Sequence, residues 1–354
     1  MNRLTRPILQ ALFAAALFGA SAPFAKLLLG QVEPVLLAGL LYLGSGLSAA
    51  LLWLGQRAQA KGVTVEAGLV WKEWPWLAGA VLAGGVVAPI VLLFSLRGTA
   101  AATASLLLNF EGLATTLIAV LFFQEAISRK IVGAIGLIAA ASIILSWDSQ
   151  GEWGFSLGAL GILLACILWG MDNNFTRRIS AKNPLTIVTV KGLVAGSFSL
   201  VLGLILGNPL PGWPTLLGAM VLGSLSYGLS IMLFILSMRE LGAARSSALF
   251  STAPFIGALL SFLILRDPLD GRFVVGLLVM GLGASLLVGE DHGHAHHHSY
   301  LAHEHRHRHD DNHHRHDHPE PSVLLDHAHP HEHSAGQHEH PHTPDLHHHH
   351  GHDA

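Results

Sequence analysis

Residues 100–123 read AAATASLLLNFEGLATTLIAVLFF, an apolar run that contains a single acidic residue, Glu111. A helix needs roughly 20 mostly apolar residues to cross a hydrocarbon layer about 30 Å thick, because each residue rises about 1.5 Å. Of the 354 residues, 51% are apolar and 12% are charged, an apolar excess that one soluble core cannot hide. The run therefore predicts a transmembrane helix.

Similar runs recur on both sides of this one, separated by short links that carry turn or charge signals. The predicted spans are residues 8–29, 34–54, 75–96, 100–123, 130–147, 154–176, 185–206, 214–237, 243–265 and 271–289. The sequence thus predicts an all-α polytopic protein of the lipid bilayer, with ten transmembrane helices.

The chain resembles itself when it is shifted by 142 residues. The shift places Arg97 on Arg239, Ser105 on Ser247 and Glu125 on Asp267. Each half contains five predicted spans, an odd number, so the second half enters the membrane from the opposite side, as in many secondary transporters. We expect two inverted five-helix repeats, over residues 1–148 and 149–289, followed by a tail over residues 290–354.

Basic residues are distributed unevenly among the links, and Lys and Arg concentrate on the cytoplasmic side of membrane proteins. With a cytoplasmic N-terminus, the outer links hold only Lys26, Arg97, Arg266 and Arg272. The inner links then hold Arg3, Arg6, Arg57, Lys61, Lys72, Arg129, Lys130, Arg177, Arg178, Lys182, Arg239 and Arg245. We therefore expect a multi-pass protein of the cell's inner (cytoplasmic) membrane, with both ends in the cytoplasm.

The two halves resemble a known family. Each half begins with a Phe-Gly or Trp-Gly pair followed by a basic residue, Lys26 or Arg177, and each fourth helix runs into QEAIS or RDPLD. These features resemble the EamA type of the drug/metabolite transporter (DMT) superfamily. The resemblance implies a carrier for a small solute, often an exporter, with a central pocket between the halves. Such families usually have a proline midway along each fourth helix; the second half has Pro254, whereas the first has Glu111-Gly112.

Two acidic residues, Glu111 and Asp172, lie inside predicted spans. A carboxylate in hydrocarbon is unfavourable unless it is paired, hydrated or protonated, so each is a candidate for the transport pathway. Glu111 shares a helical face with Thr115 and has Asn109 nearby, while Asp172 follows Trp169-Gly170. Either acid can carry a proton or contact a cation, or it can be a polar contact between helices. We favour proton coupling at Glu111 and leave Asp172 open.

Lys191 lies about two turns into the span 185–206. Its long stem can reach the cytoplasmic surface, or its ammonium can pair with Asp172 or Glu111, and we favour the surface. Gly84-Gly85 lies inside the span 75–96. Such glycines either free backbone groups that line a cavity or serve as packing devices between helices.

All 25 histidines lie between His292 and His352. This tail has few apolar residues and recurrent prolines, so we expect it to be disordered and cytosolic. Alternating His-x-His brings imidazoles within reach of one ion, which suits Ni²⁺, Zn²⁺, Co²⁺ or Cu²⁺; the alternative is a solvated, pH-responsive segment. The candidate metal ligands are His292, His294, His296, His303, His305, His307, His309, His327, His329, His331 and His333.

Three functions fit the sequence. The first is a secondary transporter that exports a small organic solute and has a metal-binding cytosolic tail. The second is an exporter of divalent transition metals (Ni, Co or Zn) whose tail collects the ion, and the third is a membrane metal sensor without transport. We favour the first, because the membrane part has no histidine and one cysteine, Cys166, and its oxygen ligands would hold a transition metal weakly.

No phosphate-binding glycine loop and no catalytic set of residues indicates an enzyme, and we expect no required cofactor. We expect no nucleic acid partner. The sequence leaves a homodimer open.

Overall fold

The computed structural model describes residues 5–59, 68–123, 129–147, 156–179, 182–241, 246, 249–288, 292–298, 301–308, 326–333 and 336–342. The expected repeat boundaries, at residues 148–149 and 289–290, fall outside these ranges.

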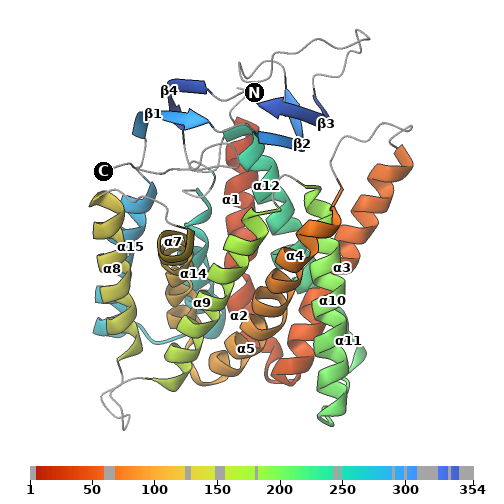
Figure 1. Cartoon of the computed structure of the whole chain (residues 1–354). Helices are drawn as coiled ribbons and strands as arrows, with labels where there is room; N and C mark the ends of the chain where they lie inside the picture. Colours follow the sequence, from red (N-terminus) through yellow and green to blue (C-terminus); the bar gives the residue numbers. More distant parts are fainter. Residues whose placement is uncertain are drawn as a thin grey trace.

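The predicted spans are helices, several of them built from consecutive segments (Figure 1). Seven helices of the described residues are long and apolar enough to cross a membrane, and three shorter apolar helices complete the predicted set. The first half consists of α1 (Thr5–Gly19), α2 (Ser21–Leu28), α3 (Pro34–Gln59), η1 (Trp71–Glu73), α4 (Trp74–Ala80), η2 (Val81–Val87), α5 (Ala88–Gly98), α6 (Ala101–Leu107), α7 (Phe110–Phe123) and α8 (Arg129–Ser146). The second half consists of α9 (Leu157–Arg177), α10 (Pro184–Ile205), α11 (Trp213–Gly223), η3 (Ser224–Leu229), α12 (Ser230–Leu241), α14 (Ala253–Leu265) and α15 (Gly271–Val288).

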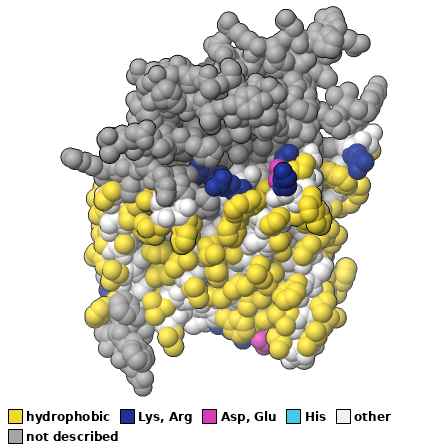
Figure 2. Space-filling view, viewed as in Figure 1, with side chains coloured by type: hydrophobic (Ala, Val, Ile, Leu, Met, Phe, Trp, Pro, Cys, Tyr) yellow, Lys and Arg dark blue, Asp and Glu magenta, His cyan; other side chains and the backbone are white. Residues whose placement is uncertain are grey.

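The surface of the helical bundle is apolar. Figure 2 shows hydrophobic side chains over the visible side of the bundle, with Lys, Arg and acidic side chains toward its two ends. Large side chains such as Leu51 and Ile205 are 71% and 76% exposed. A continuous apolar surface of this kind marks contact with lipid rather than with water. The fold is that of an all-α polytopic membrane protein, as the sequence predicts.

Local signals set the ends of the central helices. α3 begins at Pro34 and α10 at Pro184, where the missing N–H of proline has no intrahelical partner to lose. Asn183 Oδ1 caps α10 by accepting hydrogen bonds from the backbone N–H groups of Leu185 (2.9 Å) and Thr186 (3.4 Å). Gly207, with φ of 79°, follows the end of α10 in a left-handed conformation that favours glycine.

The two halves interlock. α1 packs against α12 and α14 of the second half, α9 packs against α5 and α7 of the first, and α3 packs along α10 at the centre. Gly19 on α1 approaches the backbone of Ala253, and Gly170 on α9 approaches the backbone of Thr115 so closely that a methyl group at either glycine would overlap it. The first helix of each half therefore completes the other half, which is the arrangement expected of inverted repeats.

Both halves share two irregularities. The third helix of each contains a π-helical segment, η2 in the first half and η3 in the second. The fourth helix of each is broken by a turn, between α6 and α7 in the first half and just before α14 in the second. Such interruptions free backbone groups inside the bundle and are frequent at functional sites.

Four strands follow the helices: β1 (His292–His298), β2 (Leu301–Arg308), β3 (Asp326–His333) and β4 (Gly336–His342). β1 pairs with β4 and β2 with β3, both antiparallel. These four segments belong to the tail that the sequence predicts to be disordered, and its disorder stays a prediction. The His-x-His alternation has the two-residue period of a strand.

Candidate transport site

An ion pair joins α9 to α10 inside the membrane part. Lys191 Nζ donates a hydrogen bond to Asp172 Oδ2, and Thr176 Oγ1 donates one to Asp172 Oδ1 (3.1 Å). The Asp172 and Lys191 side chains are 5% and 18% exposed. The prediction that Lys191 reaches the cytoplasmic surface is therefore wrong, because the neighbouring helix offers a buried carboxylate that a buried ammonium needs as a partner.

The ion pair lies against η2 at a point where this helix has no side chains. A Cβ atom at Gly84 would overlap the Asp172 carboxylate. A Cβ atom at Gly85 would lie 2.8 Å from Ala195 Cβ and 3.6 Å from Lys191 Cγ. Gly84 thus makes room for the Asp172 carboxylate and Gly85 for Ala195 on α10, so Gly84-Gly85 has a positioning role that its sequence alone leaves undecided.

The backbone of η2 is fixed from two sides. The carbonyl oxygen of Gly84 accepts hydrogen bonds from Tyr42 Oη on α3 (2.6 Å) and from Trp169 Nε1 on α9 (3.0 Å), and all three groups are buried. Trp169, a predicted pathway residue, therefore holds the π-helical segment in place. Tyr42 was not predicted, since a single tyrosine in an apolar helix carries no distinguishing signal.

Glu111 lies directly after the break in the fourth helix, in the first turn of α7. Its Oε1 accepts a hydrogen bond from Asn173 Nδ2 on α9 (2.9 Å), and the same amide group donates to Thr115 Oγ1 (3.1 Å). The neighbouring Asn174 fastens α9 to α7 by donating to the carbonyl of Thr115 (3.1 Å). Asn173 and Asn174 are contacts that the sequence does not assign, although both follow Asp172 in the chain.

Asn109, another predicted pathway residue, lies in the turn between α6 and α7. Its Nδ2 donates to the carbonyl oxygen of Leu106 (3.2 Å), one turn back in its own chain. Asn109 thus supports the helix break that presents Glu111, because its backbone N–H and its side-chain amide both bind the Leu106 carbonyl. The structure brings it near the site without pairing it to the carboxylate.

Glu111, Asp172 and Lys191 together form what we call the charged cluster. Glu111 is close enough to both members of the ion pair to interact with them electrostatically. Among the described residues no cation lies within ion-pair distance of Glu111, whereas Asp172 has Lys191. The cluster thus contains one neutralised carboxylate and one carboxyl group that is held by hydrogen bonds alone.

The charged cluster is poorly suited to hold a divalent metal ion, because the Lys191 ammonium already occupies Asp172 and repels a cation. The described helices contain no group of three or more His, Cys, Asp or Glu side chains that could bind a metal. The predicted metal ligands of the tail lie on β1, β2 and β3, except His309, which is outside the described residues.

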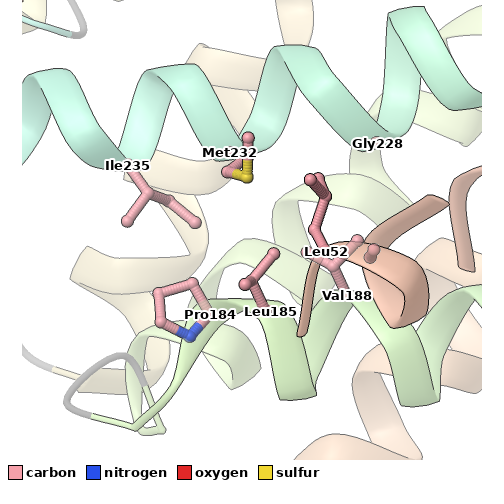
Figure 3. A pocket seen from close by; sticks show the side chains of 8 residues that line it. Leu52, Pro184, Leu185, Val188, Gly228, Met232 and Ile235 are labelled. Atoms are coloured by element: carbon pink, nitrogen blue, oxygen red, sulfur yellow. The ribbon is translucent and has the colours of Figure 1, made fainter. Parts of the chain in front are cut away.

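A narrow crevice lies elsewhere, between α3, α10, η3 and α12 (Figure 3). It is lined by Ala49, Leu52, Pro184, Leu185, Val188, Gly228, Met232 and Ile235. None of these side chains can take up a proton or orient a polar solute. We therefore place the candidate transport site at the charged cluster and not in this crevice.

Known proteins share this architecture. The EamA-like transporter family matches residues 5–147 and again residues 156–289. An uncharacterized transporter of Methanothermobacter thermautotrophicus (strain ATCC 29096 / DSM 1053 / JCM 10044 / NBRC 100330 / Delta H) is 29% identical over 293 residues, which cover 77% of this chain and 83% of the relative. A solved crystal structure with 20% sequence identity has the same fold, with a TM-score of 0.57 over 79% of this chain and 94% of that one. Since the two family matches cover both helical repeats, the chain belongs to the EamA-like transporter family.

Proposed function

We propose that this transporter exports a small organic solute in exchange for protons and that Glu111 is the proton-carrying group. The observation that carries the proposal is the state of the two acids of the membrane part: Asp172 is paired with Lys191, whereas Glu111 is held by Asn173. A carboxyl group inside the membrane part and without a cation is able to gain and lose a proton as its surroundings change.

The position of Glu111 connects this chemistry to movement of the two halves. Glu111 belongs to the first half and Asn173 to the second, so their hydrogen bond crosses the interface between the halves. A rocking motion between inverted repeats would change this contact and the access of water to Glu111. The carboxyl group would then load a proton on one side and release it when the solute site faces the other.

The direction of transport that we propose follows from the resemblance to the family. The orientation in the membrane that we propose follows from the distribution of Lys and Arg among the links. An even number of spans returns the chain to its starting side, and the basic links lie on that side. We therefore propose that both ends are cytoplasmic, that the membrane is the inner membrane, and that the solute leaves the cell.

We further propose that the histidine-rich tail binds Ni²⁺, Zn²⁺, Co²⁺ or Cu²⁺ in the cytosol and acts as a metal sensor or buffer. All 25 histidines of the chain support this assignment, since all lie beyond the last helix. The same tail is the observation that favours the second candidate, a divalent-metal exporter. The ammonium in the charged cluster favours an organic solute instead.

The proton-coupling proposal can be tested with the full chain in liposomes that contain a pH-sensitive dye. Panels of cationic, zwitterionic and anionic metabolites are added outside, and solute-driven proton flux is recorded. We expect flux with at least one class and none for Glu111→Gln. Glu33→Gln is the matched control, because Glu33 is an exposed acid that pairs with Arg97 (2.7 Å) and should leave the flux unchanged. Undiminished flux in Glu111→Gln would contradict the proposal.

The role of the tail can be tested in metal-loaded cells by comparing the full chain, a chain that stops after Glu290, and Glu111→Gln. We expect the cellular content of nickel, cobalt, zinc and copper to be unchanged, or to rise only when the tail is present. Lower metal content that requires both the tail and Glu111 would instead identify a metal exporter.

A further inference from the structure

Lys26 on α2 binds the end of α5 with its ammonium group. Its Nζ donates hydrogen bonds to the carbonyl oxygens of Leu96, of Arg97 (3.0 Å) and of Thr99 (2.8 Å). The last carbonyls of a helix lack an intrahelical donor and carry partial negative charge, so an ammonium group suits them. α2 and α5 meet toward the lower end of the bundle in Figure 1. We call this end the outer end, because it faces away from the cytoplasm in the proposed orientation.

Asp267 binds the next helix from the other half of the protein. It follows α14, and its Oδ2 accepts a hydrogen bond from the backbone N–H of Ala102 in the first turn of α6 (2.8 Å). A carboxylate at the start of a helix satisfies a free N–H group and interacts favourably with the helix dipole. Lys26 and Asp267 thus hold the short link between α5 and α6 from two sides, and the bond from Asp267 joins the two halves.

α6 and α14 pack closely next to this link. A Cβ atom at Gly257 on α14 would lie 2.8 Å from Oγ of Ser105 on α6, and Ser105 is 1% exposed. Beyond the break in the fourth helix, α7 packs against α8 and α9. There Asn173 is exposed and Glu111 is partly exposed. The described contacts therefore close the bundle on the outer side of Glu111, while side chains of the candidate site stay exposed.

The repeat relation gives both residues counterparts of the same charge. Lys26 corresponds to Arg177, and Asp267 corresponds to Glu125, which lies outside the described residues. A carrier built from two inverted repeats closes at each end in turn, so a contact that closes one end is expected to have an equivalent at the other. A basic and an acidic residue kept in both halves fit this expectation.

We propose that Lys26 and Asp267 form the outer gate of the transporter, which is closed in this structure. Release of the solute to the outside then requires the link between α5 and α6 to separate from its two partners. Removing either partner takes hydrogen bonds from the closed state, whereas the open state loses little because water binds the same groups. The populations should therefore shift toward the open state. This inference rests on the proposed transport and orientation, and it needs no knowledge of the solute.

The gate can be tested by thiol labelling of the full chain in right-side-out and inside-out membrane vesicles. A membrane-impermeant maleimide is added to chains with Cys166→Ser, so that only an introduced thiol reacts. Ser105→Cys reports the contact between α6 and α14, and among the described residues Ser105 Oγ has no hydrogen-bond partner to lose. Asn173→Cys reports the candidate site. We expect Ser105→Cys to react slowly from the outside and Asn173→Cys to react readily from the cytoplasmic side.

The gate variants should change the two rates in opposite directions. Lys26→Met and Asp267→Ala should each raise the outside rate of Ser105→Cys by about tenfold, because each removes hydrogen bonds to a charged group. Both should lower the cytoplasmic rate of Asn173→Cys, because one end closes when the other opens. Asp267→Asn keeps an oxygen acceptor for the N–H of Ala102, so it should change the rates much less than Asp267→Ala.

Glu33→Gln is the matched control at the same end of the bundle. It breaks the exposed pair with Arg97 (2.7 Å), which water screens, and should leave both rates unchanged. Unchanged rates in Lys26→Met and Asp267→Ala would overturn the outer gate. A rise of both rates together would also overturn it, because that result indicates unfolding rather than alternation.

The labelling experiment is independent of the test of proton coupling, since it requires neither solute nor a proton gradient. Failure of the expected rate changes would leave the role of Glu111 standing. Undiminished proton flux in Glu111→Gln, together with the expected rate changes, would overturn the proposed proton coupling and keep the outer gate.

Discussion

The positions of the charged cluster have counterparts in the other repeat. These counterparts lie on corresponding helices and carry no charge. The repeat relation places Glu111 on Ala253 and Asp172 on Ser21. Lys191 and Leu41 each lie seven residues after the proline that begins their helix, Pro184 or Pro34. The three counterparts, Ala253, Ser21 and Leu41, are all buried, whereas in the charged cluster only Asp172 is fully buried.

Different groups form the hydrogen bonds within each of the two sites. At η2 an indole and a phenol bind one backbone carbonyl, whereas the hydroxyls of Ser226 on η3 and Ser230 at the start of α12 donate to the carbonyls of Leu17 (2.7 Å) and Ala14 (2.8 Å) on α1. The π-helical segments and broken fourth helices thus belong to the shared carrier scaffold. The charged side chains belong to one side only, so the proton-coupled step that we propose there needs no equivalent step at η3.

Moving the carboxyl group to the other site should give the largest effect. In the double variant Glu111→Ala/Ala253→Glu we expect complete loss of solute-driven proton flux, because the second site has the uncharged Ser21 and Leu41 at the positions that correspond to Asp172 and Lys191. Flux assays in liposomes, with protein incorporation measured in parallel, check this expectation. Recovery of flux in the double variant would mean that the two sites are chemically equivalent.

Removing the ammonium should give the next largest effect, on stability. Lys191→Met leaves the Asp172 carboxylate buried without a cation, which costs about 3–5 kcal/mol. Leu41→Met, at the uncharged counterpart, should cost less than about 1.5 kcal/mol because it conserves volume. Unfolding of the purified chain in detergent measures both. Equal losses would show that Asp172 and Lys191 are not a stabilising pair in the folded protein.

A methyl group at Gly84 should have an intermediate effect. Gly84→Ala forces the Asp172 carboxylate away from η2 and should cost about 1–3 kcal/mol of stability, as overpacking usually does. Gly112→Ala is the matched control, since a Cβ atom there meets nothing within 4 Å. The same unfolding measurement applies, and a neutral Gly84→Ala would argue against close contact between η2 and the ion pair.

The smallest effect should come from the indole hydrogen bond. Trp169→Phe keeps an aromatic ring but removes the indole N–H that donates to the Gly84 carbonyl. This carbonyl keeps its hydrogen bond from Tyr42, so we expect the free energy of unfolding to fall by about 0.5–1.5 kcal/mol. Trp213→Phe, at an exposed position at the start of α11, should change stability less. If Trp213→Phe were the more destabilising change, the hydrogen bond from Trp169 to the Gly84 carbonyl would not stabilise η2.

The prediction of the spans and of the two halves succeeded because length and apolarity are local properties. A run such as residues 100–123 crosses a bilayer whatever surrounds it, and a repeat of five spans inverts by parity alone. The acids Glu111 and Asp172 of the membrane part stood out for the same reason, since a charge in an apolar run is visible without knowing its neighbours.

The prediction for Lys191 failed because the choice between the surface and a partner depends on a second helix. The site roles of Tyr42, Asn173 and Asn174 are equally invisible in the sequence, since each of these side chains acts on a group that lies far away in the chain.

The sequence by itself determined that this protein is a ten-span membrane protein of two inverted halves, with acids in the membrane part and histidines in its tail. Tertiary structure alone decided that Asp172 is neutralised, that Glu111 is held by an amide from the other half, and that Gly84 makes room for the Asp172 carboxylate. The physical reason is that hydrophobic transfer acts on each helix separately, whereas the pairing of buried charges requires two helices in contact.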